Sequence, residues 1–439
     1  MKIKRIDALV ALMLLVGMCF AQQNLSAQEQ KRDVVNHQNY VRESVVLDPS
    51  SNQTLVTHHY YDGVGRMVEK VMRGVTPSRK DLVTYREYNE TDLIGKEWLA
   101  YPVEGNQGFY SHGDGRVACD FYADNRPYQE TLYEQSPARR PAAVQAAGDV
   151  WQEHPSRMNY LLNKDTEELR CRFYRVEGQA LKDKGWYLPG QLQVKKTEDE
   201  DGKLAYTFTN ASGLTVLERK VDGDVCFDTY YVYDYIDNLR YVLPPLAWPD
   251  LSSGNLTKYA YRFDYDEWKH CVKKQLPGGN VVEYAYDYAD RLIFSQDAVQ
   301  KKLQEASFYF YDIYGREAVR GICRMAVFTP LSELVGAVKR TSSGGDLQSG
   351  YLFPLTLELK RLISVSYYDD YDFLNLDLMK DAKSTLTYSA EPGYDSRYVS
   401  DILPQVSAKG QLTGRCIFAV DIPSSCRECS AFYYDNKDR

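Results

Sequence analysis

The segment KYAYRFDYDEWKHCVKKQLPGGNVVEYAYDYADRLIFSQ (residues 258–296) and the nearby SFYFYDIYGREAVRG (residues 307–321) contain one six-residue phrase three times. It reads YDEWKH at 265–270, YDYADR at 286–291 and YDIYGR at 311–316. The Asp residues of successive copies are 21 and 25 positions apart. A period of this length is typical of stacked supersecondary units.

Each copy follows a run of aromatic and β-branched residues, such as 281–286 and 307–311, which favours a strand. The Asp side chain can accept a hydrogen bond from the backbone N–H two residues on. The fifth position of the phrase requires a left-handed backbone, which Gly adopts freely and Asp or Asn next best. We therefore expect each repeat to be a strand, a tight turn and a second strand.

Further copies are YDGVGR at 61–66, YDYIDN at 233–238 and YDNKDR at 434–439. The fifth position is Gly or Asp in five of the six copies and Lys269 in the other, where the pattern predicts a distorted turn. We expect Arg66, His270, Arg291 and Arg316, at the sixth position, to pair with an Asp or stack on a Tyr of the adjacent repeat. The predicted structural turn positions are Asp62, Gly65, Arg66, Asp234, Asp237, Asp266, Asp287, Asp290, Arg291, Asp312, Gly315, Arg316 and Asp435.

Together with the phrases at 230–234, 239–245, 273–279, 290–297, 133–137 and 367–373, these copies resemble bacterial RHS (rearrangement hot spot, YD-repeat) proteins. The resemblance is to the secreted type that begins with an N-terminal domain of unknown function, and it runs from about Asn39 to the end of the sequence. It implies a mostly β fold, in which stacked hairpins form part of an RHS-like β-shell with a few short helices.

Full-length members of that family continue to a self-cleaving core and a variable toxin or effector tip, and nothing here resembles either. The resemblance therefore implies a truncated member, the N-terminal wall of a shell in a polymorphic toxin system. The expected function is a non-enzymatic structural scaffold that would encapsulate or present a C-terminal effector absent from this chain. Its expected partners are the remainder of the shell or the effector.

The sequence divides into five expected regions. They are a signal peptide (1–21), a flexible arm (22–38), a domain of unknown function with degenerate repeats (39–177), a YD-repeat β region (178–328), and a helix-containing insertion with further strands and an incomplete final repeat (329–439). Within them we expect a turn at Gly95, a loop over 105–115, a helix over 331–339 and a short helical turn within 373–383.

The first 21 residues have the character of an export signal. Lys2, Lys4 and Arg5 precede an apolar run over 8–20 that is too short to span a membrane comfortably. Cleavage after Ala21 is favoured over cleavage after Ala27 because it puts the small Cys19 at the −3 position. We expect an exported protein with no transmembrane anchor after cleavage, located in the periplasm, at the cell surface or outside the cell. The net charge of −8 argues against a nucleic-acid partner.

The sequence offers no recognisable catalytic constellation. The six His residues form no HExxH motif, and no GxSxG or P-loop phrase is present. The acidic run at 198–201 lacks the spaced ligands of a calcium loop and indicates a solvated hairpin tip. The repeat Asp residues could be imagined as paired glycosidase carboxylates, but their recurrence at turns favours a structural role. We expect no enzymatic activity, cofactor or metal.

Nine cysteines are present, and Cys416, Cys426 and Cys429 cluster near the end. This cluster favours one local disulfide, with free cysteines as the main alternative and a metal site as the least favoured.

The 37 Tyr residues leave a second hypothesis open. Tyr can fill the strands of a wall, or it can form an aromatic platform for a binding module that holds a cell-surface glycan or a protein. Aromatic residues clustered on one exposed face would favour the binding module, whereas aromatic residues alternating into a core would count against it.

Overall fold

The computed structural model describes residues 38–434 apart from 49–52, 106, 329–334, 343, 381, 388–407 and 419–425. The predicted signal peptide, nearly all of the predicted arm and the turn position Asp435 lie outside the described residues. The chain forms two compact modules. The N-terminal module contains residues up to Asn159 together with Thr197–Lys203, and the C-terminal module contains Tyr160–Lys196 and everything from Leu204 onward.

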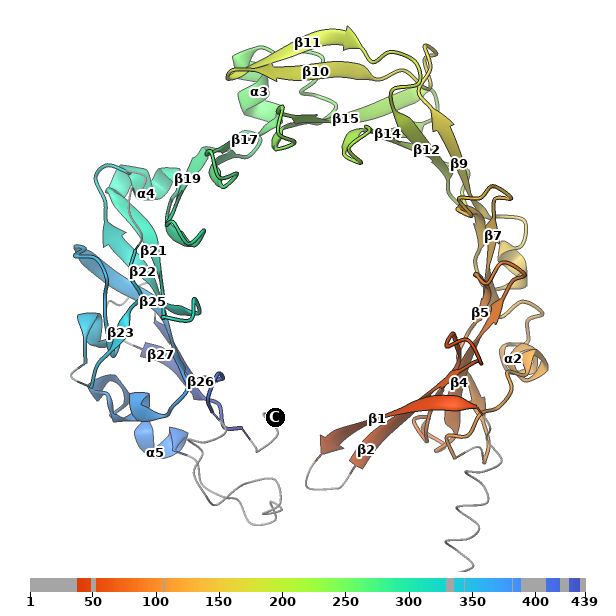
Figure 1. Cartoon of the computed structure of the whole chain (residues 1–439), viewed down its shortest axis with the longest axis horizontal. Helices are drawn as coiled ribbons and strands as arrows, with labels where there is room; N and C mark the ends of the chain where they lie inside the picture. The colour runs from red at the N-terminus through yellow and green to blue at the C-terminus, as the bar shows by residue number, and fades with distance from the viewer. Residues whose placement is uncertain are drawn as a thin grey trace, which may run out of the picture. The chain divides into compact units, whose positions relative to one another are not determined.

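The fold is mostly β, as expected, and its strands pair antiparallel (Figure 1). The strands of the N-terminal module are β1 (Asn39–Asp48), β2 (Gln53–Tyr61), β3 (Met67–Met72), β4 (Asp81–Tyr88), β5 (Ile94–Trp98), β6 (Tyr101–Val103), β7 (Tyr128–Tyr133), β8 (Pro141–Gln145) and β9 (Ser156–Leu162, whose last three residues belong to the C-terminal module). Within the module β1 to β4 pair in chain order, β4 also pairs with β5 and β6, and β5 continues through β7 and β8 to β9. Its helical segments are α2 (Gly115–Tyr122) and η1 (Asp149–Trp151).

The C-terminal module is a longer meander. Its strands are β10 (Arg172–Glu177), β11 (Ala180–Trp186), β12 (Gln193–Glu198, whose last two residues belong to the N-terminal module), β13 (Leu204–Thr209), β14 (Thr215–Asp222), β15 (Val225–Tyr233), β16 (Leu239–Leu243), β17 (Tyr261–Tyr265), β18 (Cys271–Gln275), β19 (Val281–Tyr286), β20 (Leu292–Gln296), β21 (Glu305–Tyr311), β22 (Glu317–Arg324), β23 (Lys339–Arg340), β24 (Tyr351–Leu352), β25 (Leu359–Tyr368), β26 (Leu412–Phe418) and β27 (Cys426–Ala431). Strands β13 to β22 pair in sequence, and β22 continues through β25 and β26 to β27. Its helical segments are α3 (Ser253–Tyr259), α4 (Ala298–Leu303), α5 (Lys383–Leu386), η2 (Asp346–Gln348), η3 (Asp372–Asn375) and η4 (Asp377–Met379).

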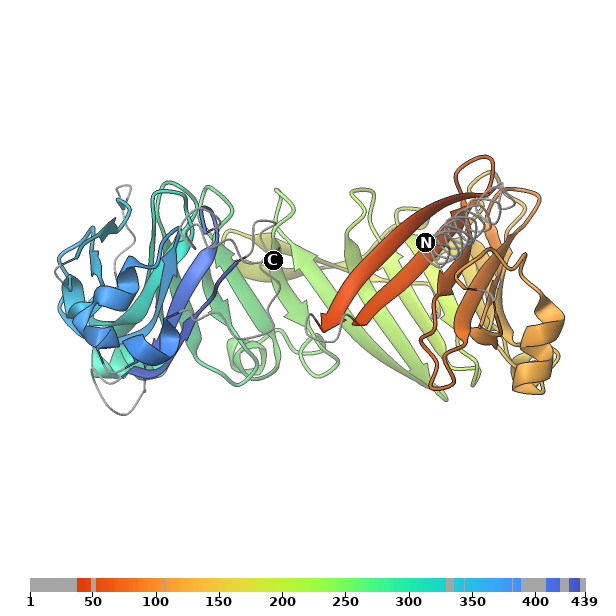
Figure 2. The same cartoon turned by 90° about the horizontal axis from the view of Figure 1, so that it is seen from below.

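Alternation along the strands places one face of the sheet in the core. In β21, Ala306, Phe308 and Phe310 are fully buried, whereas Ser307 and Tyr309 point to the other, partly exposed face. Because successive strands are antiparallel, every turn that joins an odd strand from β13 to β21 to the next even strand lies at the same edge of the sheet. Figure 2 shows these turns of the C-terminal module along one edge.

Two local predictions were wrong, and the first concerns Gly95. Gly95 lies inside β5, and the turn is formed by Asn89–Leu93 instead. The expected loop over 105–115 is confirmed for its described residues up to Asp114, which accepts a hydrogen bond from the Arg116 N–H (3.0 Å) and caps α2.

The helix expected over 331–339 is also absent from its described part. Residues 335–338 are irregular, and Lys339 begins β23. Val335 and Val338 are buried in the core, so the apolar spacing reflects an irregular segment that inserts two side chains rather than one helix face. The short helical turn expected within 373–383 is present as η3 and η4.

Within the part of the chain that the structure describes, no helix is both long and apolar enough to cross a membrane.

Candidate functional site

The repeated phrase forms a turn with one hydrogen-bond pattern, which Asp312 illustrates. Its N–H donates to the Arg316 carbonyl (2.9 Å), and its own carbonyl accepts from the Gly315 N–H (3.1 Å). Its Oδ1 accepts from the N–H groups of Tyr314 and Arg316 (2.9 Å each). The same four bonds occur in turns headed by Asp62, Asn89, Asp199, Asn210, Asp234, Asp266, Asp287 and Asp312.

The fifth position is left-handed in all eight turns. The φ angles are Gly65 86°, Asp92 63°, Gly202 78°, Gly213 81°, Asp237 66°, Lys269 69°, Asp290 59° and Gly315 80°. The turn at Lys269 keeps all four hydrogen bonds, so the distortion expected there is absent. Lys269 adopts a backbone conformation that costs a non-glycine residue free energy, and the four bonds hold it there.

We call the Asp or Asn at the second position of each turn its head. The sixth residue of the phrase contacts the second carboxylate oxygen, Oδ2, of an Asp head. Arg66 and Arg316 donate Nε to Oδ2 of Asp62 and Asp312 (2.7 and 2.6 Å), and His270 Nδ1 lies 2.9 Å from Oδ2 of Asp266. The turns headed by Asn89 and Asn210 have Leu93 and Leu214 at this position. An Asn head therefore occurs where the sixth residue has no donor for a second oxygen.

The same sixth residues also join one turn to the next. Arg66 pairs with Asp92, the fifth residue of the following turn, and His270 Nε2 lies 3.0 Å from Oδ1 of Asp290 in the equivalent position. Arg316 reaches Asp369, which follows β25.

Each of these side chains also stacks on the Tyr that precedes the next head. The Arg66 guanidinium lies 4.5 Å from the Tyr88 ring centroid, the Arg316 guanidinium lies 4.2 Å from that of Tyr368, and the His270 and Tyr286 rings stack at 4.5 Å. Both contacts expected of the sixth residue, with an Asp and with a Tyr of the adjacent repeat, are present for Arg66, His270 and Arg316. Arg291 pairs with Asp287 of its own turn (2.6 Å), and its guanidinium lies 5.2 Å from the Tyr311 ring centroid.

At seven places a Tyr near the end of a strand completes the connection. Its hydroxyl donates to the carbonyl of the residue that follows the sixth position of the preceding turn, at 2.7–3.3 Å. The pairs are Tyr88–Met67, Tyr133–Ile94, Tyr233–Thr215, Tyr286–Cys271, Tyr311–Leu292, Tyr368–Glu317 and Tyr434–Leu412. We call this set of turn-to-turn contacts, from Arg, His and Tyr side chains, the turn ladder. It uses seven of the 37 Tyr residues.

One repeat is split by an insertion. Asp369 donates its N–H to the Gln411 carbonyl (3.1 Å), and its Oδ1 accepts from the Gly410 N–H (2.7 Å). Gly410 is left-handed (φ 88°). Gly410 and Gln411 thus occupy the fifth and sixth places of a turn whose head is Asp369, although residues 370–409 intervene.

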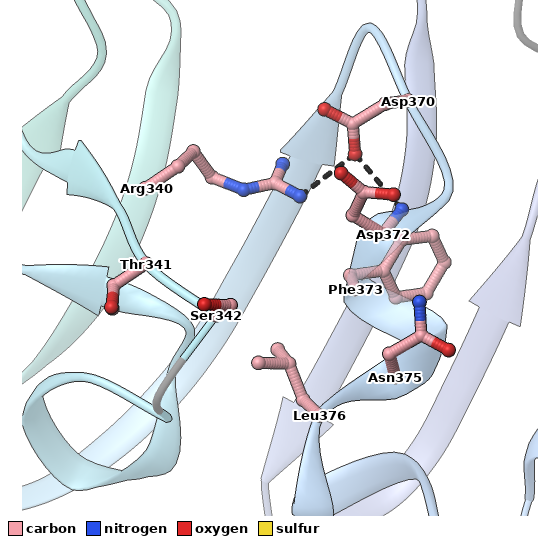
Figure 3. A pocket seen from close by; sticks show the side chains of 8 residues that line it. All are labelled: Arg340, Thr341, Ser342, Asp370, Asp372, Phe373, Asn375 and Leu376. Carbon is pink, nitrogen blue, oxygen red and sulfur yellow. Dashed lines mark hydrogen bonds and ion pairs between the residues drawn. The ribbon is translucent and has the colours of Figure 1, made fainter.

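A small pocket lies beside this split turn (Figure 3). Its volume is about 240 Å³, and its lining residues are Arg340, Thr341, Ser342, Asp370, Asp372, Phe373, Asn375 and Leu376. Arg340 donates to Asp370 Oδ1 (2.8 Å), which also accepts from the Asp372 N–H (3.0 Å). Because Asp370 already accepts hydrogen bonds from Arg340 and from the Asp372 N–H, the geometry favours a structural role for the Arg340–Asp370 ion pair over proton transfer by Asp370.

Two carboxylates in the N-terminal module are deeply buried. Glu69 accepts from the Ser111 N–H (2.7 Å), the Ser111 hydroxyl (2.9 Å) and the Gly113 N–H (3.0 Å). Asp81 accepts from the Gly108 N–H. Burial raises the pKa of Glu69, and these three hydrogen bonds oppose that shift. Both carboxylates anchor the loop before α2 to the sheet.

The C-terminal module contains a buried ion pair. Arg219 and Asp228 form a two-pronged ion pair (2.7 Å for each bond), and both side chains are 6% exposed. The Arg219 Nη1 group donates to the backbone carbonyls of Glu167 and Glu168 (3.0 and 2.8 Å). The Tyr230 hydroxyl donates to Asp228 (3.1 Å). With these partners in place, the pair is structural.

Of the clustered cysteines, two are brought together. Cys416 on β26 and Cys429 on β27 are directly opposite in the register, and their Sγ atoms lie 2.9 Å apart. Cys426 is opposite Phe418, and its side chain lies outside the described part of the structure. Among the described residues there is no group of three His, Cys, Asp or Glu side chains that could hold a metal ion.

Sequence reasoning missed four heads, which are Asn89, Asp199, Asn210 and Asp369. Two signals could have found them. Asn offers the same Oδ1 acceptor as Asp, and Tyr88 and Tyr368 directly precede Asn89 and Asp369. The acidic run at 198–201 does form a hairpin tip, headed by Asp199.

Comparison with known proteins gives a match over part of the chain. A family model described as a domain of unknown function (DUF6443) matches residues 33–162. No curated protein matches the chain. Similar solved structures include TcdB2-TccC3 (TM-score 0.47, 10% identity, covering 91% of this chain and 18% of that one) and the Tc holotoxin pore of Photorhabdus luminescens (TM-score 0.45, 12% identity, 91% and 16%). The chain therefore spans less than a fifth of the length of these proteins.

Proposed function

We propose that this chain is an exported, non-enzymatic structural scaffold, the N-terminal wall of an RHS-type shell that encapsulates or presents a C-terminal effector. The observation that carries the proposal is the turn ladder. In it, Asp, Arg, His and Tyr side chains of the repeated phrase bind within their own turn and to a neighbouring turn or strand. Side chains used in this way hold a wall together.

The shell is tested on the native product. An affinity tag inserted at the exposed tip residue Val64, which is 77% exposed, would allow purification from the producing cells without disturbing the core. We expect a particle larger than this chain, in which electron microscopy shows a hollow β wall containing these repeats. An isolated monomer of 50.5 kDa with no associated chain would contradict the proposal.

The absence of enzymatic activity is tested separately. A panel of glycan, peptide and nucleic-acid substrates should show no turnover above that of heat-treated protein. Turnover that disappears in a single carboxylate variant with an intact fold would refute the non-enzymatic assignment. The pair Asp370 and Asp372 would be the first to substitute, because both line the pocket.

Export is tested by mass spectrometry of the protein outside the cytoplasm. The mature chain should begin at Gln22, or else at Gln28 if the second cleavage site is used. An intact Met1 or a lipid on Cys19 would overturn this part of the proposal.

A second candidate function is a binding module for a cell-surface glycan or protein. Large apolar side chains project from the turn tips at one edge of the C-terminal module. They are Tyr235 (89% exposed), Trp268 (63%), Tyr288 (58%), Ile313 (75%) and Tyr314 (71%). The Trp268 and Tyr288 ring centroids lie 6.1 Å apart, which offers an adjoining pair of aromatic surfaces. The core aromatic residues Phe308 and Phe310 count against a general aromatic platform, so this hypothesis is confined to the tips.

Titration of the protein with soluble polysaccharides and peptides tests the tips. Binding that is lost in Trp268→Ala and retained in Trp268→Phe would favour the binding module. Equal binding by both variants would exclude the tips as its site.

A further inference from the structure

Cys416 and Cys429 occupy a specific place at the end of the sheet. Cys416 is fully buried between β25 and β27, opposite Val365 on one side and Cys429 on the other. Cys429 is partly exposed. Among the described strands, β27 pairs only with β26. A covalent link here would therefore fasten β27 to its one described neighbour.

The backbone geometry suits such a link. Directly opposed residues of antiparallel strands have Cα atoms about 4.5–5.5 Å apart, within the range of about 4.4–6.8 Å that disulfides require. The two Sγ atoms already lie 2.9 Å apart and need to approach by only about 0.9 Å to reach a disulfide bond length of about 2.05 Å.

The other two pairings in the cluster fit poorly. Cys426 and Cys429 are on one strand and three residues apart, which corresponds to about 10 Å between Cα atoms at a rise of about 3.3 Å per residue. That is beyond the reach of a disulfide. Cys426 is opposite Phe418, two places along β26 from Cys416, so pairing those two would require a shift of register.

We propose that Cys416 and Cys429 form a cross-strand disulfide when the protein meets a low-molecular-weight disulfide such as oxidised glutathione. The partly exposed Cys429 thiolate attacks one sulfur of the small disulfide, forms a mixed disulfide and releases one small thiolate. The Cys416 thiolate then attacks the Cys429 sulfur and releases the second. Two protein thiols are oxidised, and one small disulfide is reduced to two thiols.

The experiment uses the full chain equilibrated in glutathione buffers from reducing to oxidising. Free thiols are alkylated in acid before digestion, so that no exchange follows. Trypsin cleaves after Arg415 and Arg427, and Asp-N cleaves before Asp421, so each of the three cysteines falls in a separate peptide. We expect a linked pair of the peptides that begin at Cys416 and Glu428, and a loss of two titratable thiols.

Three variants sharpen the test. Cys426→Ser should keep both the linked peptides and the higher thermal midpoint of the oxidised protein, which we expect to exceed that of the reduced protein by about 5 °C. Cys429→Ser and Cys429→Ala should lose both. A link that involves Cys426, or three alkylated cysteines after oxidising equilibration, would overturn the proposal. Because the wild type and Cys426→Ser decide the pairing, a folding failure of another variant leaves the test intact.

Discussion

Replacing Asp312 by Ala should open the turn between β21 and β22. The substitution removes the acceptor of two backbone N–H groups (2.9 Å each) and of the Arg316 Nε (2.6 Å). A hydrogen bond to a charged group contributes about 1.5–3 kcal/mol, but this turn is partly solvated, so water replaces part of the loss. We therefore expect Asp312→Ala to lower the local stability by about 2–4 kcal/mol.

Asp312→Asn is the matched comparison, because Asn89 and Asn210 head identical turns. The amide oxygen keeps both backbone hydrogen bonds, and only the charge opposite Arg316 is lost. Arg316 retains Asp369 as a partner, so no unpaired charge is left behind. The expected cost is about 1 kcal/mol, the value of a partly exposed ion pair.

Hydrogen exchange measured by mass spectrometry is the appropriate assay, because it reports local opening within one module and does not require two-state unfolding of the whole chain. Peptides from β21 and β22 should exchange faster in the order wild type, Asn, Ala, while peptides around Asp62 remain unchanged. Ile313→Ala is the control, since that side chain is 75% exposed at the tip of the same turn. Equal protection in the Asn and Ala variants, or an effect of Ile313→Ala as large as that of Asp312→Ala, would refute the assigned role of the carboxylate.

Three further predictions test other parts of the structure. Gly65→Val should destabilise the N-terminal module by about 1–3 kcal/mol because φ is 86° there. Gly63→Val in the same turn has open space and no positive φ, so it should cost far less. The urea midpoints of the two variants would show whether the backbone angle is the cause. Lys269→Gly should stabilise its turn by up to about 1 kcal/mol by relieving a left-handed Lys, less the entropy that Gly adds to the unfolded chain, and a lower melting midpoint would contradict this. The pKa of Glu69 is raised, so its contribution to stability is complete below its usual pKa and is lost as the pH rises through the raised value. Glu69→Gln should therefore flatten the fall in stability of the N-terminal module above about pH 4.5. If the melting midpoints of the two proteins change in parallel from pH 4 to 7, the prediction is wrong.

The local part of the turn was predictable because its causes are local. An Asp that bonds to N–H groups two and four residues on, and a left-handed fifth residue, are properties of five consecutive residues. Asn89 was not predicted because the repeated phrase has Asp, and not Asn, at its second position. The bonds from one turn to the next were harder to predict, since the Tyr133 hydroxyl meets the Ile94 carbonyl 39 residues earlier in the chain. Only the register of the sheet brings such groups together.

The helix expected over 331–339 failed for a different reason. Apolar residues three or four apart match a helix face, but they equally match an irregular segment that places isolated side chains in a core. Here the Val338 N–H donates to the Tyr311 carbonyl and the Val335 carbonyl accepts from Arg291, so tertiary hydrogen bonds replace those of a helix. Such partners lie outside any local window.

The split turn at Asp369 shows which part of this architecture is free to vary. Residues 370–409 separate the head from Gly410, yet the hydrogen bonds to Gly410 and Gln411 form, and Tyr368 still donates to the Glu317 carbonyl. The ladder is therefore maintained by contacts across the sheet and does not require a short connection between the strands. An insertion at a turn tip can therefore add new surface without disturbing the sheet. Asp370, Asp372 and three further lining residues of the pocket in Figure 3 belong to this insertion. A binding site could therefore arise in such an insertion while the repeats keep their hydrogen bonds.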